Sequence, residues 1–126
     1  TYNTVGWHRL PENASIFQQT ADPSSGPTTA HIEIIPSNGV SKAPYPAVGS
    51  YFGIGIVLLT PTSRDSITIS SANPFDPPVI NLNFLTTDFD SFTMREGIRA
   101  ARRFVTAPAC SDYIILESAT LLLMQS

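Results

Sequence analysis

Prolines decide which parts of this chain can form regular structure. A proline lacks a backbone N–H and fixes its own φ, so it ends helices and is excluded from central strands. Eleven prolines occur among the 126 residues, and most of them stand in residues 1–30, 41–50 and 73–80. The sequence therefore predicts loops or extended connectors in these three stretches. In the first of them, Ile16 and Phe17 offer a short apolar anchor.

Three stretches between the prolines have the pattern of strands. Residues 30–36 alternate Ile32 and Ile34 with Glu33, a two-residue period rich in β-branched side chains. Residues 51–60 are apolar nearly throughout, which predicts a strand buried on both faces. Residues 66–70 alternate again, and their closeness to the preceding strand predicts that the two pair as a hairpin.

One helix is predicted from Thr87 to about Ala107. Thr87 and Asp90 have the form of a capping box, with Asp in place of the usual Glu, and Pro108 ends the element. Four apolar residues recur at helical spacing along it, namely Met94, Ile98, Ala101 and Val105. This pattern predicts an amphipathic helix that covers a sheet. A second helical stretch is predicted over residues 111–125.

Together these elements predict an α+β fold, an antiparallel sheet backed by helices. The hydrophobic fraction of 42% excludes a disordered chain. A net charge of −3 and an isoelectric point near 5.1 give no reason to expect nucleic acid or an anionic membrane as a partner. No apolar run reaches the roughly 18 residues that a membrane span needs.

Most patterns that could carry chemistry have a simpler structural explanation. Gly53 and Gly55 lack the third glycine of a nucleotide-binding loop, so a tight strand contact is the better interpretation. His8 and His31 have no neighbouring Cys, Asp or Glu at ligand spacing, so no metal site is predicted. No GxSxG nucleophile elbow is present. The arginines of the predicted helix are better explained as an ion-paired, solvated face than as an anion site.

Glu33 is the residue with the most open interpretation. It stands mid-strand between isoleucines, where a carboxylate needs either a partner or access to water. The solvent side of a strand and a functional site are both possible. Tyr51, Phe52 and the other aromatic residues could line an apolar pocket or form the core.

The residues 58–85, LLTPTSRDSITISSANPFDPPVINLNFL, and 87–104, TDFDSFTMREGIRAARRF, carry a family resemblance. An Arg-turn-strand, an Asn-Pro-x-x-x-Pro-x-Ile connector and a capped helix follow one another at fixed spacing. The pieces VGWHRLPENASIF, DPSSGP and AHIEIIPSNG precede them in the same order. The chain resembles the glucose-methanol-choline (GMC) oxidoreductases, and looks most like their fungal aryl-alcohol oxidase branch.

This resemblance implies an enzyme that uses FAD to oxidise a CH–OH donor, an aryl or other primary alcohol, to a carbonyl. Its partners would be a small alcohol and the remainder of the GMC polypeptide, and its location extracellular. Residues 1–115 would be part of the substrate-binding domain, and residues 116–126 a divergent C-terminal tail. By position, Glu33 matches a carboxylate near the substrate cavity. Tyr51 and Phe52 match an aromatic pair on the neighbouring strand.

Arg64 and Pro74 match motif positions that we interpret as structural. No catalytic, cofactor-binding or metal-binding residue is predicted in this chain. The family's GxGxxG and its catalytic histidine, in an HPxGT-type motif, would lie outside these residues, so the chain alone is predicted to be inactive. The alternatives are a non-catalytic β-rich domain that binds an apolar ligand, and an inactive truncated gene product.

Overall fold

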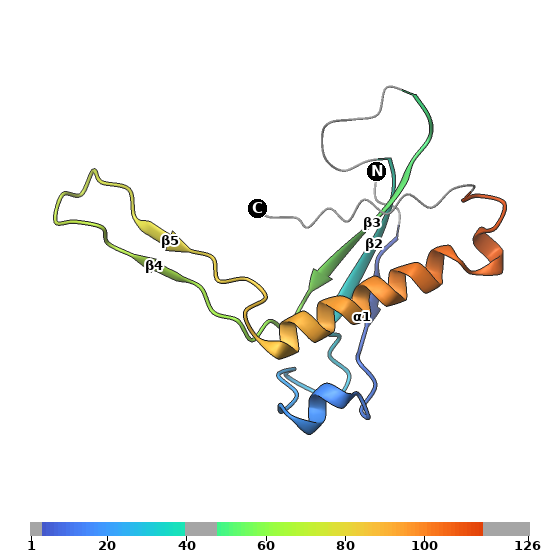
Figure 1. Ribbon diagram of the computed structural model, residues 1–126, viewed down its shortest axis with the longest axis horizontal. Coiled ribbons are helices and arrows are strands. Elements are labelled where there is room, and N and C mark those ends of the chain that lie inside the picture. The colour runs from blue at the N-terminus through green and yellow to red at the C-terminus, as the bar shows by residue number, and fades with distance from the viewer. Residues whose placement is uncertain (1–3, 40–47, 115–126) are drawn as a thin grey trace.

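The computed structural model describes residues 4–39 and 48–114, and in these it contains two antiparallel sheets and one long helix (Figure 1). The first sheet has the strand order β1-β2-β3, and its strands are β1 (Gly6–His8), β2 (Ile32–Asn38) and β3 (Phe52–Leu58). The second contains β4 (Ser66–Thr68) and β5 (Val79–Asn81). The helices are α1 (Asp88–Val105) and the short 3₁₀ turns η1 (Ser15–Gln18) and η2 (Pro108–Cys110). The predicted α+β fold is confirmed.

The strands pair differently from the sequence prediction. β2 and β3 form an antiparallel pair with Ile34 opposite Ile56, and β4 pairs with β5. The predicted hairpin between residues 51–60 and 66–70 is therefore wrong. The prolines of the connector do not prevent pairing of β5, because they precede Val79 and leave the backbone N–H groups of the strand available.

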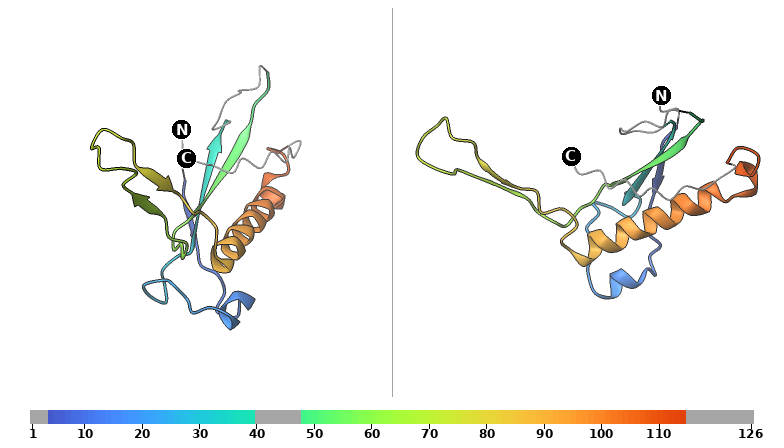
Figure 2. Two further views of the ribbon diagram at one scale, coloured as in Figure 1. Left: turned by 60° about the vertical axis from the view of Figure 1, so that its left-hand side comes forward. Right: turned by 45° about the horizontal axis from the view of Figure 1, so that its top comes forward.

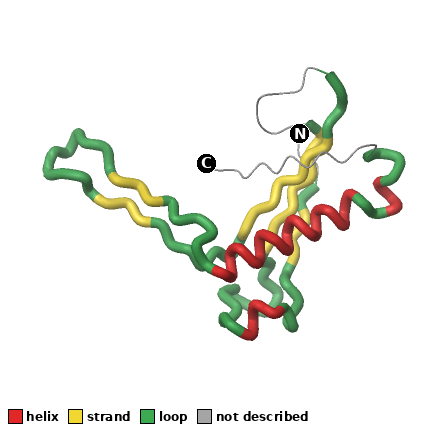
Figure 3. The backbone as a smooth tube through the Cα atoms, viewed as in Figure 1, coloured by secondary structure: helices red, strands yellow, loops and turns green. Residues whose placement is uncertain are grey.

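Helix α1 confirms the predicted amphipathic helix. Thr87 is its N-cap, and the Thr87 hydroxyl accepts a hydrogen bond from the Asp90 backbone N–H. The helix lies across one face of the three-stranded sheet (Figures 1 and 3). Its most buried line is Phe89, Thr93, Gly97 and Ala101. Only Ala101 belongs to the predicted apolar line. The helix face that meets the sheet is therefore rotated about the helix axis, relative to the predicted face, by about one residue position.

Gly97 allows α1 to approach the sheet closely. A Cβ at this position would lie 2.7 Å from Cγ2 of Ile56 and 3.2 Å from Cγ2 of Ile32. The buried core around this contact contains Leu10, Ile16, Ile32, Ile34 and Phe89. Burial of Ile16 on η1 agrees with the predicted apolar anchor in the N-terminal loop. Within residues 4–39 and 48–114, no helix covers the other face of the sheet, and Val57 of β3 is 39% exposed. The prediction that this strand is buried on both faces is therefore wrong for the described part of the chain.

The β4–β5 hairpin projects away from the rest of the molecule. Figure 1 and the right-hand view of Figure 2 show it extending away from the three-stranded sheet. Every residue from Arg64 to Phe84 is exposed. Residues 111–114 follow η2 as a turn, and the rest of the predicted second helix, 115–125, lies outside the described residues. The predicted divergent tail, 116–126, lies outside them as well.

Candidate functional site

Strand alternation places Glu33 on the face of the sheet that α1 leaves open. Successive side chains of a strand point to opposite faces. Ile32 and Ile34 are buried beneath the helix, so Glu33 between them projects the other way. The Glu33 side chain is half-buried. The carboxylate therefore has access to whatever covers this face.

Two apolar side chains flank Glu33 on the neighbouring strands. Trp7 of β1 and Val57 of β3 are its partners in the two strand registers. Residues directly opposite in an antiparallel pair have Cβ atoms about 4.5–5.5 Å apart and share a face. Trp7 is 65% exposed. The open face thus carries a row of indole, carboxylate and isopropyl groups across three strands, which we call the Trp7–Glu33–Val57 row.

Further along β3, this strand presents no side chains on the same face, because the residues there are glycines. Gly55 lies opposite Ile35, and Gly53 lies opposite Ser37. A Cβ at Gly53 would stand 3.1 Å from the Gly39 carbonyl oxygen and 3.3 Å from the Ser37 hydroxyl, so a close backbone approach requires this glycine. This agrees with the tight strand contact predicted from the glycine pair at Gly53 but not at Gly55, where a Cβ would lie an ordinary 3.8 Å from Ile35.

Tyr51 and Phe52 do not join Glu33. Phe52 lies on the helix side, where its ring stacks 6.5 Å from Phe104 and meets Tyr113 edge-on at 5.8 Å. Tyr51 is exposed, and its hydroxyl donates a hydrogen bond to the Val48 carbonyl oxygen at 2.9 Å. Tyr51 lies six positions before Val57, which corresponds to roughly 20 Å along an extended chain.

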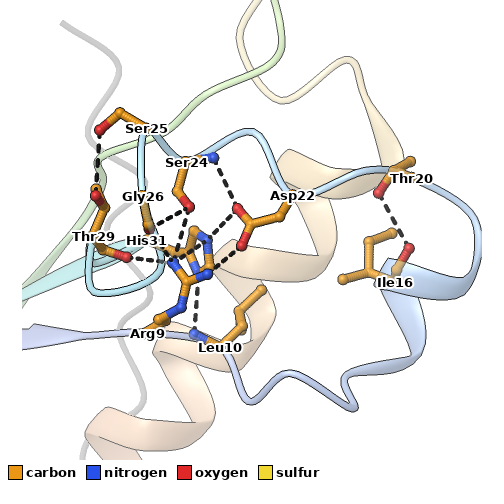
Figure 4. A network of polar contacts seen from close by, with 10 residues as sticks. All are labelled: Arg9, Leu10, Ile16, Thr20, Asp22, Ser24, Ser25, Gly26, Thr29 and His31. Carbon is orange, nitrogen blue, oxygen red and sulfur yellow. Dashed lines mark hydrogen bonds and ion pairs between the residues drawn. The ribbon is translucent and has the colours of Figure 1, made fainter.

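A polar network that sequence reasoning missed holds the loop before β2 (Figure 4). His31 is fully buried, and its Nδ1 accepts a hydrogen bond from the Leu10 backbone N–H at 3.0 Å. The proton therefore sits on Nε2, which donates to Asp22 Oδ1 at 3.0 Å. Arg9 pairs with the other Asp22 oxygen and donates to the Thr29 carbonyl oxygen at 2.7 Å.

This network ties the residues that follow β1 to the loop that precedes β2. Burial would raise the pKa of Asp22, but hydrogen bonds from the side chain and backbone of Ser24 and from His31 outweigh it and hold that pKa well below its usual range. The two hydrogen-bond partners of His31, Asp22 and Leu10, are 9 and 21 residues away in the sequence. No local sequence pattern predicts such distant contacts. The one weak indication that His31 is buried was its position just before Ile32 and Ile34, which enter the core.

Arg64 and Pro74 lie in the projecting hairpin and away from Glu33. Arg64 donates to the Pro61 carbonyl oxygen at 2.8 Å, and its own carbonyl oxygen accepts from the Asn83 side chain at 2.9 Å. Pro74 occupies the second position of a turn in which the Asp76 N–H donates to the Asn73 carbonyl oxygen at 3.1 Å. Proline is favoured at this position because its φ is already set for the turn.

Asp90 joins the root of this hairpin to α1. Its side chain is fully buried and accepts hydrogen bonds from the backbone N–H groups of Thr62, at 2.7 Å, and Ser63, at 2.9 Å. Burial would raise the pKa of Asp90, but the hydrogen bonds from Ser63 and Thr62 outweigh it and lower the pKa below its usual 3.8. Asp90 is therefore an anchor between two elements as well as a helix-terminal charge.

The described residues do not fit the phosphate end of FAD. A pyrophosphate binds where a glycine-rich turn opens a helix and presents free backbone N–H groups. The helix α1 begins instead with Asp88 and Asp90 in its first turn, and the glycine pair of β3 is followed by Pro61 and not by a helix.

No group of three or more His, Cys, Asp or Glu side chains that could hold a metal lies within the residues described. Within that part of the chain, no helix is long and apolar enough to cross a membrane.

Comparison with known proteins identifies the class to which this sheet and helix belong. The sequence pattern of the GMC oxidoreductase family matches residues 61–123. Dehydrogenase eriK of Hericium erinaceus is 34% identical over 112 residues, which are 88% of this chain and 18% of that protein. A pyranose dehydrogenase of Agaricus campestris is 31% identical over 124 residues, 89% of this chain and 20% of the relative.

A third relative, an alcohol dehydrogenase (acceptor) of Pseudomonas putida, is 39% identical over 71 residues, 56% of this chain and 13% of that protein. The chain belongs to the GMC oxidoreductase family, whose members are generally FAD-dependent. It spans about a fifth of the length of the first two relatives.

Proposed function

We propose that this chain is the substrate-side segment of an FAD-dependent oxidoreductase that acts on CH–OH donors. Residues 1–115 would belong to the substrate-binding domain and residues 116–126 to a divergent tail. The flavin site would come from the remainder of the polypeptide, because the residues described here do not fit its phosphates. By family analogy the enzyme would be extracellular, with a small alcohol as its substrate.

One observation carries this proposal: Glu33 stands on a sheet face that its own helix does not cover. A carboxylate between apolar neighbours is costly when it is covered by apolar groups, and it is satisfied when a hydroxyl donates to it. Glu33 would therefore accept a hydrogen bond from the hydroxyl of the bound alcohol and fix its orientation.

The class of alcohol is a finer proposal. The family branch that the sequence resembles favours an aryl or other primary alcohol. The match to a pyranose dehydrogenase supports a sugar as the second candidate. Tyr51 and Phe52 stay cavity candidates, with weaker support than Glu33. Tyr51 lies beyond the Phe52 end of β3, and the Phe52 side chain lies on the helix side of the sheet.

The test is a Glu33→Gln substitution in the full-length polypeptide. The amide keeps the size of the side chain and removes the charge, so we expect a loss of about ten-fold or more in kcat/KM for alcohol oxidation, since hydrogen bonds to charged groups contribute roughly 1.5–3 kcal/mol. Flavin reduction by alcohol under anaerobic conditions measures this loss.

Glu96→Gln is the matched control, because Glu96 makes only a surface ion pair with Arg99 on α1. An equal effect of the two substitutions would contradict the role of Glu33. A full-length protein that neither retains FAD nor reduces it with any alcohol would contradict the proposed function. The isolated chain is expected to retain no FAD and to oxidise no benzylic alcohol.

A further inference from the structure

The Trp7–Glu33–Val57 row contains a side chain that the proposed function does not yet use. Trp7 is the only tryptophan of the chain, and it is directly opposite Glu33 in the β1–β2 register. With 65% of its surface exposed, it makes little contact with the residues described. A large aromatic side chain presented beside a carboxylate is typical of a binding surface.

The chemistry of the row restricts what can cover it. A wholly apolar partner would bury the Glu33 carboxylate without a donor, at a cost of several kcal/mol. A wholly polar partner would leave the faces of Trp7 and Val57 without apolar contact. A ring that carries a hydroxyl group satisfies both, because its face can stack on the indole while the hydroxyl donates to the carboxylate.

We propose that Trp7 is a specificity-determining residue that stacks on the ring of a cyclic alcohol whose hydroxyl donates to Glu33. This inference rests on the proposed function and adds the shape of the substrate to it. An aromatic ring has a flat face, and a pyranose chair has a face of C–H groups; both can lie against the indole ring. Acyclic alcohols can reach Glu33 but gain nothing from Trp7.

The experiment compares Trp7→Ala, Trp7→Leu and Trp7→Phe in the full-length flavoprotein. The substrates are benzyl alcohol, D-glucose and 1-propanol. We expect Trp7→Ala to lower kcat/KM by about ten-fold for the preferred ring alcohol, because it removes the aromatic surface on which the ring stacks, and less than about two-fold for 1-propanol. Trp7→Phe should recover most of the loss, whereas Trp7→Leu should not.

His8→Ala is the matched control, because His8 is the next residue of β1 and projects from the opposite face. It should leave the ratio of ring to acyclic activity unchanged. If Trp7→Ala does not fold, the Leu and Phe variants carry the comparison, since both keep an apolar side chain. The larger loss, with benzyl alcohol or with D-glucose, distinguishes an aromatic from a pyranose ring.

Four results would overturn the inference. A loss of the same size for all three alcohols would mean that Trp7 only supports the fold, and unchanged kinetics would mean that it contacts no substrate. A wild-type enzyme that reduces its flavin with 1-propanol but with neither ring alcohol would refute the inference and leave the proposed function intact. A wild-type protein without any alcohol-dependent flavin reduction would refute both.

Discussion

The two strand pairs of this molecule each contain two isoleucines in register, but their environments are opposite. Ile34 and Ile56 face each other across β2 and β3, and Ile67 and Ile80 face each other across β4 and β5. Ile34 is 5% exposed, whereas Ile67 is 69% exposed. The difference comes from α1, which covers the first pair and does not reach the second. Burial here depends on the element that packs on a strand and cannot be deduced from the strand itself.

The largest expected effect comes from shortening one isoleucine in each pair. Ile34→Ala should lower the free energy of unfolding by about 2–5 kcal/mol, because it leaves a cavity beneath α1. The matched change Ile67→Ala should alter it by no more than about 0.5 kcal/mol, because Ile67 is already exposed. Urea titration followed by circular dichroism measures both. Equal losses would show that the hairpin is buried by some other part of the polypeptide.

An intermediate effect is expected where the two regions meet. Asp90→Asn should lower the free energy of unfolding by about 1–3 kcal/mol, because one amide oxygen cannot accept all the hydrogen bonds of the buried carboxylate. The lowered pKa of Asp90 means that its contribution is complete above the unfolded value of 3.8 and is lost as the pH falls below it.

Unfolding measured between pH 7 and pH 3 should therefore show a steeper acid loss in the wild type than in Asp90→Asn. Asp88→Asn is the control, because Asp88 is exposed in the same turn of α1. If the two variants had the same stability at every pH, Asp90 would not anchor the hairpin.

The smallest effect is expected at the hairpin turn. Pro74→Ala should destabilise the hairpin by about 0.4–1 kcal/mol, because the alanine chain has more conformations to lose on folding. Hydrogen exchange of the β4 and β5 amides should become faster, while exchange in β2 and β3 should not change. Faster exchange in both sheets would contradict the separation of the two regions.

Local signals made the helix predictable, and distant contacts did not. The cap at Thr87, the negative charges after it and Pro108 all act within one or two turns, and the observed helix ends within two residues of the predicted one. The strand partners were wrong because a short connection between residues 60 and 66 suggested a hairpin. The actual partner of β3 is β2, whose contact with α1 could not be deduced from either strand.

The candidate site was predictable only in part. The two-residue period around Glu33 was enough to place it opposite the core, since Ile32 and Ile34 had to be buried. That Trp7 would stand beside it depends on the register between β1 and β2, and a one-residue shift would have put His8 or Gly6 there. The burial of Asp90 depends on partners 27 and 28 residues away, so its sequence neighbours indicated only a helix-terminal charge.

The position of Glu33 between two core isoleucines restricts how this gene can change length. Inserting or deleting one codon within β2 would exchange the two faces, turning a carboxylate toward α1 and an isoleucine toward the open side. Such a mutation would remove the candidate site and the core in one step. Length variation among descendants of this sequence should therefore collect after Asn38 and after Leu58, while the seven codons of β2 keep their number even where their identities drift.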